Sequence, residues 1–361
     1  MKILQVITSL RTGGAEKLIV DTFPHYRKRG LDVDILLFDG TDTPFKRQLE
    51  AMGARIYSLG TGGSVYNPIR LFRLLPYLRR YDIVHTHNTA PQLFAAIGSV
   101  LCSVVLCTTE HNTSNRRRGW TWYGPVDRWM YSRYRRVISI SEGTTRELLQ
   151  STEVRCPVVT IPNGIDVRRY AEAQPADRRT LGCTANDFLL VMVAGFRYQK
   201  DQDTVIRSLR FLPTDVHLCL VGGGERQKAC EQLAAELHFE NRVTFAGIRT
   251  DVPAVLKAAD GVVMSSHYEG FGLAAVEGMA AGRPVIASDV EGLGDIVRNY
   301  GMLFPVGDER ALADAVLKLK SDEAFRKEVS ARCRERAWQY DISRMVEGYI
   351  KVYEELMAVQ K

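Results

Sequence analysis

The residues best suited to chemistry stand in the stretch 265–282, where two glutamates separated by seven residues lie in a frame of glycine and alanine. The apolar run before it predicts a buried strand, and the Ala-rich segment that contains Glu277 favours a helix. The intervening loop carries Glu269, Gly270 and Gly272. Its backbone N–H groups and the helix dipole favour an anion, typically a phosphate, and its glycines allow close backbone approach. The glutamates are placed to address two ends of one elongated ligand; the alternative is a solvated helix start with two unrelated carboxylates.

Two cations follow another apolar run, 188–194. Arg197 and Lys200 lie three residues apart at the expected carboxyl end of this strand. In a parallel sheet that edge borders the ligand crevice, where cations could neutralise a diphosphate. Without that context they would be ordinary surface charges.

The chain opens with a third arrangement of strand, glycine loop and helix. The apolar run 2–7 precedes Gly13 and Gly14, and a helical pattern then continues to about Gly30. Such glycine pairs are often plain turns. Pro24 should kink or split the helix.

Three histidines follow or lie within predicted strands of the first half. His111 comes directly after the strand 104–108, where it is either structural or near a substrate. His85 and His87 alternate along a strand, so both rings should point to one face. Because no third ligand is evident, we assign no metal and favour a structural or acceptor-side role.

These motifs occur in the order found in one enzyme family. The stretch from Glu269 through "EGFGLAAVEGMAAGRPVIASD", the "GGAE" loop, the "PNGID" turn at 162–166 and the Lys200-Asp201 loop resemble the signature of retaining GT-B glycosyltransferases of family four. The resemblance implies that Glu269 lies near the donor sugar and that Glu277 binds the ribose hydroxyls. It places Lys200 on the donor phosphates, with Arg197 two residues out of step, and His111 beside the reacting sugar.

The resemblance thus implies three catalytic residues and a donor-binding set. The catalytic residues are Lys200, Glu269 and His111. The donor-binding residues are Gly13, Gly14, Asn163, Arg197, Ile248, Gly270, Phe271, Gly272, Leu273 and Glu277.

Two series of short apolar runs predict an α/β protein with two Rossmann-like parallel sheets, and the GT-B resemblance implies that they face an interdomain cleft. We expect an acceptor-binding domain over 1–165 and a nucleotide-sugar-binding domain over 166–341, joined by a turn-rich linker at 158–187. The resemblance implies that a C-terminal helix, 342–361, packs back onto the first domain.

Composition limits the class of protein. The 361 residues are 45% hydrophobic and 25% charged, which is ordinary for a globular chain with two cores. No run of about 18 uncharged apolar residues and no signal peptide is evident. The seven scattered cysteines favour reduced thiols over disulfides or zinc. We therefore expect a cytoplasmic protein.

The net charge of +6 is unevenly placed. Arginines and aromatic residues interleave over 116–136 and again over 68–80, a pattern that suits an anionic membrane surface. Ordinary helices with solvated arginines are the alternative. We exclude nucleic acid, because no recognition motif accompanies the charge.

From the resemblance we expect a retaining, metal-independent glycosyltransferase without a cofactor. It would move a hexose-type sugar from a UDP- or GDP-sugar to a glycan or polyprenyl-diphosphate-linked acceptor, in cell-surface polysaccharide synthesis at the inner face of the cell membrane. A nucleotide-sugar epimerase or phosphorylase of the same fold, or a non-catalytic nucleotide-sugar-binding protein, stays open.

Overall fold

The computed structural model describes residues 1–11, 13–111 and 124–358. The chain forms two compact units, Met1–Gly164 with Ile342–Lys361 and Ile165–Asp341, called here the first and second unit. The predicted boundary at 165/166 differs from this division by one residue. The acceptor and donor roles of the two units stay predictions.

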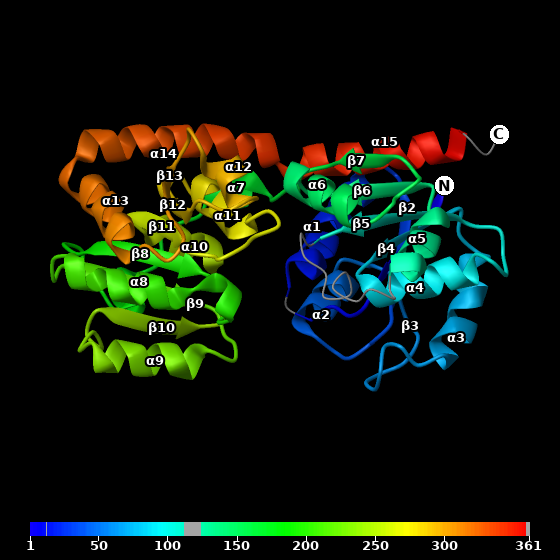
Figure 1. Ribbon diagram of the computed structural model, residues 1–361, viewed down its shortest axis with the longest axis horizontal. Helices are drawn as coiled ribbons and strands as arrows, with labels where there is room; N and C mark the ends of the chain where they lie inside the picture. Colours follow the sequence, from blue (N-terminus) through cyan, green and yellow to red (C-terminus); the bar gives the residue numbers. More distant parts are fainter. Residues whose placement is uncertain (12, 112–123, 359–361) are drawn as a thin grey trace. The chain divides into compact units, whose positions relative to one another are not determined.

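The first unit is built on a parallel sheet with the strand order β3-β2-β1-β4-β5-β6-β7 (Figure 1). Its strands are β1 (Lys2–Ile7), β2 (Asp32–Leu37), β3 (Ile56–Ser58), β4 (Ile83–His87), β5 (Val105–Glu110), β6 (Arg136–Ser139) and β7 (Val158–Thr160). Its helices are α1 (Gly14–Lys28), α2 (Pro44–Ala51), α3 (Ile69–Leu78), α4 (Thr89–Gly98), α5 (Gly124–Ser132), α6 (Glu142–Ser151) and the C-terminal α15 (Ile342–Ala358).

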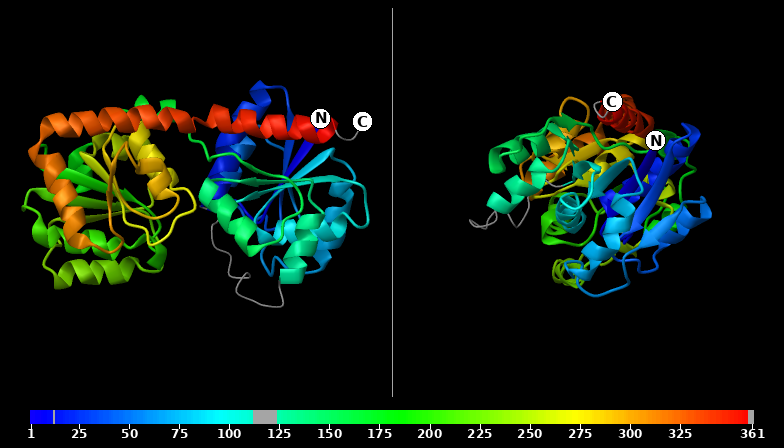
Figure 2. Two further views of the ribbon diagram at one scale, coloured as in Figure 1. Left: turned by 45° about the horizontal axis from the view of Figure 1, so that its top comes forward. Right: turned by 90° about the vertical axis from the view of Figure 1, so that its right-hand side faces the viewer.

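Alternate residues of the first unit's strands enter different cores. On β1, Leu4 and Val6 join a core that also takes side chains from α3, α4 and α5, whereas Ile7 joins a core with α1 and α2. This is the period-two alternation expected of a sheet covered on both faces. Helix α15, drawn in red, lies beside α1 and contributes buried Tyr349 and Tyr353 (Figures 1 and 2).

The second unit repeats the plan with the strand order β10-β9-β8-β11-β12-β13, again parallel throughout. Its strands are β8 (Phe188–Val193), β9 (Val216–Val221), β10 (Val243–Gly247), β11 (Gly261–Met264), β12 (Val285–Ser288) and β13 (Met302–Phe304). Its α-helices are α7 (Val167–Ala171), α8 (Gln202–Ser208), α9 (Gln227–Glu236), α10 (Val252–Ala258), α11 (Leu273–Ala280), α12 (Leu293–Val297), α13 (Glu309–Ser321) and α14 (Glu323–Ala337). Short 3-10 turns are η2 (Arg178–Leu181), η3 (Tyr198–Lys200), η4 (Leu209–Phe211) and η5 (Trp338–Tyr340).

The predicted fold class of two Rossmann-like parallel sheets is confirmed, but one local prediction is wrong. The stretch 158–187 is not a plain linker, because it contains β7, α7 and η2. Helix α1 continues through Pro24 without splitting, and a kink there stays a prediction. Gly164 does not adopt a positive φ; a glycine is required there because a Cβ would lie 2.7 Å from the Cα of Ile342.

Among the described residues, no helix is both long enough and apolar enough to cross a membrane.

Candidate functional site

The candidate residues of the second unit gather where the strand order reverses. Strand β8 lies between β9 and β11 in the sheet. The chain that leaves β8 crosses to β9, and the chain that leaves β11 crosses to β12, so the two loops start side by side and run in opposite directions along the sheet. In parallel sheets such a switch point opens a crevice at the carboxyl ends of the strands. Lys200 follows β8 and Glu269 follows β11, on the two sides of this switch point.

Backbone and side-chain hydrogen bonds join these two loops. The His267 N–H donates to the Gln199 carbonyl at 2.8 Å, and the Gln199 amide donates to the Tyr268 carbonyl at 3.0 Å. The buried Ser265 hydroxyl lies within 2.9 Å of the carbonyls of Lys200 and Asp201. The position of one loop therefore fixes that of the other.

Lys200 and Glu269 form an ion pair across these loops, through the lysine Nζ and the carboxylate Oε2. Both side chains are mostly buried, with 19% and 14% of their surfaces exposed. Asp201, next to Lys200, adopts the left-handed conformation at φ 50° and caps α8 through Thr204. The paired charges thus sit on a rigid turn, where the ammonium can meet an anion and the carboxylate can meet hydroxyls bonded to it.

Helix α11 begins at the adjacent loop and carries the second glutamate. Gly272 precedes it at φ 95° without a side-chain cap, so the helix start is left to the backbone N–H groups. A Cβ on Gly272 would lie 2.5 Å from the Leu293 side chain. Glu277 is buried and accepts a hydrogen bond from the Tyr170 hydroxyl at 2.7 Å, which orients its carboxylate.

The remaining predicted residues of the second unit differ in exposure. Arg197 is exposed and makes no ion pair within the described residues, so it is not held beside Lys200. Ile248 follows β10 with 74% of its surface exposed. The Phe271 ring is buried edge-on against Tyr340, so a ligand at this loop could contact the backbone of Phe271 and not its ring. Leu273 is the first residue of α11 and Gly270 belongs to the same loop.

In the first unit the predicted glycines lie at the start of α1, and Asn163 lies next to the unit's boundary at Gly164. Gly13 is the N-cap of α1, and a Cβ there would lie 2.2 Å from the Glu16 carboxylate, which folds back over it. Gly14 is the exposed first residue of the helix. Asn163 is buried, and its Oδ1 has no hydrogen-bond partner within the described residues.

The fold brings His111 beside His87, and His85 lies next to His87. The sequence alone did not predict that the three histidines form one cluster. The Nε2 of His111 lies 2.9 Å from the Nδ1 of His87, and the Nε2 of His87 bonds the Gln5 side-chain oxygen. His85 bonds Tyr353 at 2.6 Å and Thr109 at 2.7 Å. His85 and His87 do point to one face of the sheet, as the alternation predicted, but both use both ring nitrogens and have no lone pair left for a metal.

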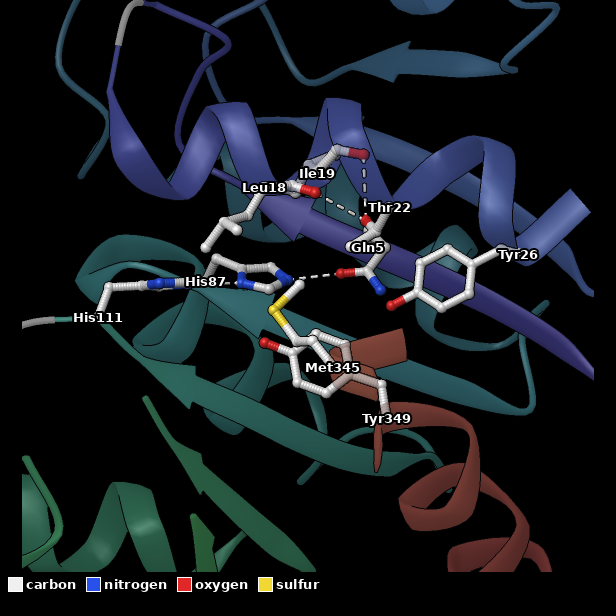
Figure 3. A pocket seen from close by; sticks show the side chains of 9 residues that line it. All are labelled: Gln5, Leu18, Ile19, Thr22, Tyr26, His87, His111, Met345 and Tyr349. Atoms are coloured by element: carbon white, nitrogen blue, oxygen red, sulfur yellow. Dashed lines mark hydrogen bonds between the residues drawn. The ribbon is translucent and has the colours of Figure 1, made fainter. Parts of the chain in front are cut away.

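Figure 3 shows His87, His111 and Gln5 at a small cavity beneath α1 and α15. Burial lowers the pKa of His85 to about 3 and that of His111 to about 4, and it lowers the pKa of His87 well below its usual value. All three imidazoles are therefore neutral at neutral pH. No group of His, Cys, Asp and Glu suited to hold a metal ion occurs among the described residues.

Sequence reasoning missed Tyr170, Gln5 and Tyr353. Tyr170 is 107 residues from its partner Glu277, so no local spacing links them. Gln5 did leave a signal, because it is a polar residue inside the apolar run of β1. Tyr349 and Tyr353 share one face of α15 by their four-residue spacing.

Two family models match the chain; one match lies within the second unit, and the other covers most of the first unit and the first residues of the second. The model described as "Glycosyl transferases group 1" matches residues 173–339, and the model described as "Glycosyltransferase Family 4" matches residues 12–169.

Curated relatives carry specific transferase and synthase names. The N-acetyl-alpha-D-glucosaminyl L-malate synthase of Bacillus anthracis is 28% identical over 231 aligned residues. The aligned part makes up 62% of this chain and 61% of that enzyme. The phosphatidyl-myo-inositol mannosyltransferase of Mycobacterium leprae is 28% identical over 95% of this chain and 93% of its own length.

Solved structures share the whole fold. Alr3699/HepE of Anabaena, solved in complex with UDP-glucose, is 25% identical and superposes with a TM-score of 0.86. The match covers 98% of this chain and 100% of that one.

The buried histidines make the stability of the first unit depend on pH. The unfolded chain binds protons at these histidines below about pH 6.5, whereas the folded chain does not until pH 3–4, so stability falls as the pH drops through this window. Between pH 7.5 and 5.5, the His87→Asn variant should lose about 1 kcal/mol less unfolding free energy than the wild type. Urea denaturation, with hydrogen exchange of β4 amides as the local probe, measures this. A His238→Asn variant at an exposed position should keep the wild-type dependence; equal losses in wild type and His87→Asn would contradict the assignment.

Proposed function

We propose that this chain, a glycosyltransferase of the group 1 and family 4 type, moves a hexose-type sugar from a nucleoside diphosphate to a glycan or lipid-linked acceptor with retention of the anomeric configuration. The observation that carries the proposal is the Lys200–Glu269 pair at the switch point of β8 and β11. In a nucleotide sugar, the bond that breaks joins the diphosphate to the sugar ring. A lysine ammonium beside a carboxylate suits this ligand, because the ammonium can bind the diphosphate while the carboxylate accepts hydrogen bonds from the sugar hydroxyls.

The reaction transfers the sugar from the leaving diphosphate oxygen to an acceptor hydroxyl: the bond from the sugar to the diphosphate breaks, the bond from the sugar to the acceptor oxygen forms, and the acceptor's proton passes to the departing diphosphate oxygen. Negative charge grows on the diphosphate as the bond breaks, and a preorganised cation stabilises that charge. Lys200 takes this role, with backbone N–H groups at the start of α11. Glu269 accepts hydrogen bonds from the sugar, and Glu277, oriented by Tyr170, accepts them from the ribose. No metal or cofactor enters this scheme.

The names of the relatives support a sugar nucleotide donor and a lipid-linked acceptor. Alr3699/HepE was solved with UDP-glucose, so a UDP-hexose is the first donor to test. The Mycobacterium leprae relative is named for phosphatidyl-myo-inositol, a lipid. An acceptor of this kind, or one on a polyprenyl diphosphate, fits a cytoplasmic enzyme of cell-surface polysaccharide synthesis.

We also propose that the first unit attaches to an anionic membrane. On α3 the exposed side chains Ile69 and Phe72 lie three residues apart on one face, and the exposed Arg79 and Arg80 follow the helix. Arg73 is exposed on the same face, but its guanidinium donates to the Leu59 carbonyl at 2.8 Å. Apolar and basic side chains together suit the headgroup region.

The structure narrows this membrane proposal. Arg70 is buried and bonds the carbonyls of Ser64 and Gly62, so it is not available to lipid. Arg128 pairs with Glu153, and Arg136 pairs with Glu355. Residues 116–123 of the second predicted segment lie outside the described residues, so α3 carries the proposal.

The donor prediction tests the function itself. Calorimetric titration with UDP-, GDP- and ADP-sugars should identify a donor, and Glu277→Ala should weaken binding of that sugar nucleotide and of its free nucleoside diphosphate. A lost hydrogen bond to a charged group is worth about 1.5–3 kcal/mol, or about ten- to a hundredfold in affinity. Glu236→Ala, at an exposed glutamate of α9, should bind like wild type. Unchanged affinity in Glu277→Ala would leave Glu277 without a ribose role, and turnover without an acceptor would indicate an epimerase.

Lys200→Ala should lower turnover about 10²-fold, because one preorganised group that stabilises charge is removed. The assay is run with EDTA present, since the proposed chemistry uses no metal. Removing Lys200 also leaves the unpaired Glu269 carboxylate to repel the diphosphate. The double variant Lys200→Ala/Glu269→Gln removes that repulsion, and it should stay slow if the loss of the lysine charge is the main cause. Lys228→Ala, an exposed lysine of α9, is the control. Normal turnover in a folded Lys200→Ala protein, or activity that requires added Mg²⁺ or Mn²⁺, would contradict this mechanism.

The membrane prediction uses vesicles. The protein should cosediment with anionic vesicles at low salt, release at high salt and ignore neutral ones, because each basic residue contributes about 1 kcal/mol near an anionic surface. Replacing Ile69 and Phe72 by serine, or Arg79 and Arg80 by glutamate, should reduce binding without changing donor affinity. Leu149→Ser, at an exposed leucine of α6, should have no effect. Equal binding to neutral and anionic vesicles, or none to either, would favour a soluble acceptor.

A further inference from the structure

Three buried polar side chains of the first unit connect His111 to helix α15. Gln5 is on β1, His87 ends β4 and Tyr353 is on α15, and all three are almost fully buried. Together with His85 and Thr109 they form a continuous series of hydrogen bonds from His111 across the sheet to the C-terminal helix. Figure 3 shows the end of this series, where His111, His87 and Gln5 follow one another along the cavity wall.

The orientation of the Gln5 amide sets the direction of donation at its centre. Its Nε2–H donates to the Tyr353 hydroxyl at 3.0 Å, so its Oε1 is the atom that faces His87. An amide oxygen only accepts, and the His87 Nε2 must therefore carry the hydrogen. A neutral imidazole has one N–H, which leaves the His87 Nδ1 as an acceptor. The hydrogen between the two rings consequently belongs to the Nε2 of His111.

The far end of the series is compatible with the same direction. The Thr109 hydroxyl is oriented to donate to Tyr349 across a long 3.5 Å, which leaves its oxygen free to accept from His85 at 2.7 Å. His85 then donates from Nε2 to Thr109 and accepts at Nδ1 from the Tyr353 hydroxyl. Tyr353, having donated to His85, accepts from Gln5. A reversed series would require the Gln5 amide to turn over and Thr109 to donate to His85.

We propose that His87, Gln5 and Tyr353 are positioning residues that hold His111 in the tautomer with the hydrogen on Nε2, so that the bare Nδ1 of His111 accepts a hydrogen bond from a hydroxyl of a sugar substrate. His111 makes no second hydrogen bond within the part of the chain that the structure describes, and it is partly exposed at the end of β5. The tautomer stands on the hydrogen bonds alone; only the sugar as occupant rests on the proposed function.

The backbone after His87 adds to the rigidity of this arrangement. Asn88 adopts φ 67° and ψ 163°, a strained backbone conformation for a residue with a side chain. Its side-chain oxygen lies 3.5 Å from the backbone N of Thr8, beyond the end of β1. The turn that ends β4 is therefore held against β1, which also carries Gln5.

The wild-type chain without ligand tests the tautomer directly. In a long-range ¹H–¹⁵N spectrum of protein labelled at histidine, His111 should show a protonated Nε2 and an unprotonated Nδ1 at pH 7.5, with assignment from the His111→Gln spectrum. His87 should show the same form. An Nδ1–H form of His111 would mean that the series runs the other way, and it would overturn the proposal whatever the enzyme's substrate.

A pair of variants separates positioning from packing. His87→Leu removes the acceptor of His111, so the spectrum should show a second tautomer, and kcat/KM should fall about tenfold, as expected for the loss of one hydrogen bond to the substrate. His87→Asn places an oxygen where Nδ1 was and should restore the tautomer and most of the activity. Thr22→Val changes the same cavity outside the series, because Thr22 bonds the carbonyls of its own helix, and it should behave like wild type.

Equal losses in the leucine and asparagine variants would reduce His87 to a packing role and overturn the proposal. If His87→Leu does not fold, the wild-type spectrum still decides. A correct tautomer in a chain that binds no nucleotide sugar would contradict the proposed function while leaving the positioning series intact.

Discussion

The parallel arrangement of every strand is the constraint on which both units depend. Because parallel strands end at the same edge, each loop that follows a carboxyl end is placed beside the others of its sheet. In each unit the strand order reverses once near the middle, between β1 and β4 and between β8 and β11. Lys200 and Glu269 lie at the reversal of the second unit, as the general rule for open α/β sheets predicts. They meet there although 69 residues separate them in the chain. In the first unit Gly13 follows β1 and His87 ends β4, whereas His111 follows the neighbouring strand β5.

Burial of polar groups near these edges is tolerated because they are paired. Leaving a buried donor or acceptor unsatisfied costs about 1–3 kcal/mol. The first unit meets this condition by linking its buried histidines to Gln5, Thr109 and Tyr353, and the second by seating Ser265 on the carbonyls of Lys200 and Asp201. Asn163 and Gln202 are among the exceptions, because neither the Oδ1 of Asn163 nor the Oε1 of Gln202 has a hydrogen-bond partner within the described residues.

The sequence predicted the strands well because strands buried on both faces read as continuous apolar runs. The bounds of β1 agree with the predicted run 2–7 residue for residue, and β8 ends one residue before the end of the predicted run 188–194. The strands β7 and β13, each a three-residue edge strand, were missed. Glycine loops and the Glu-x7-Glu spacing identified the candidate loops. Contacts between distant segments, such as Tyr170 with Glu277, were invisible because no local spacing encodes them.

The C-terminal helix shows why a segment remote in sequence can belong to a site. Helix α15 returns to the first unit after 177 residues of the second, and it places Tyr353 against both Gln5 and His85. An apolar residue at position 353 would fill the space but would leave two buried polar groups without a partner, and it would also release the Gln5 amide to turn over. The tyrosine therefore does more than cover the sheet. It selects one of two directions in which a chain of neutral groups can donate, and that choice reaches His111 through two intervening side chains without any charge being moved.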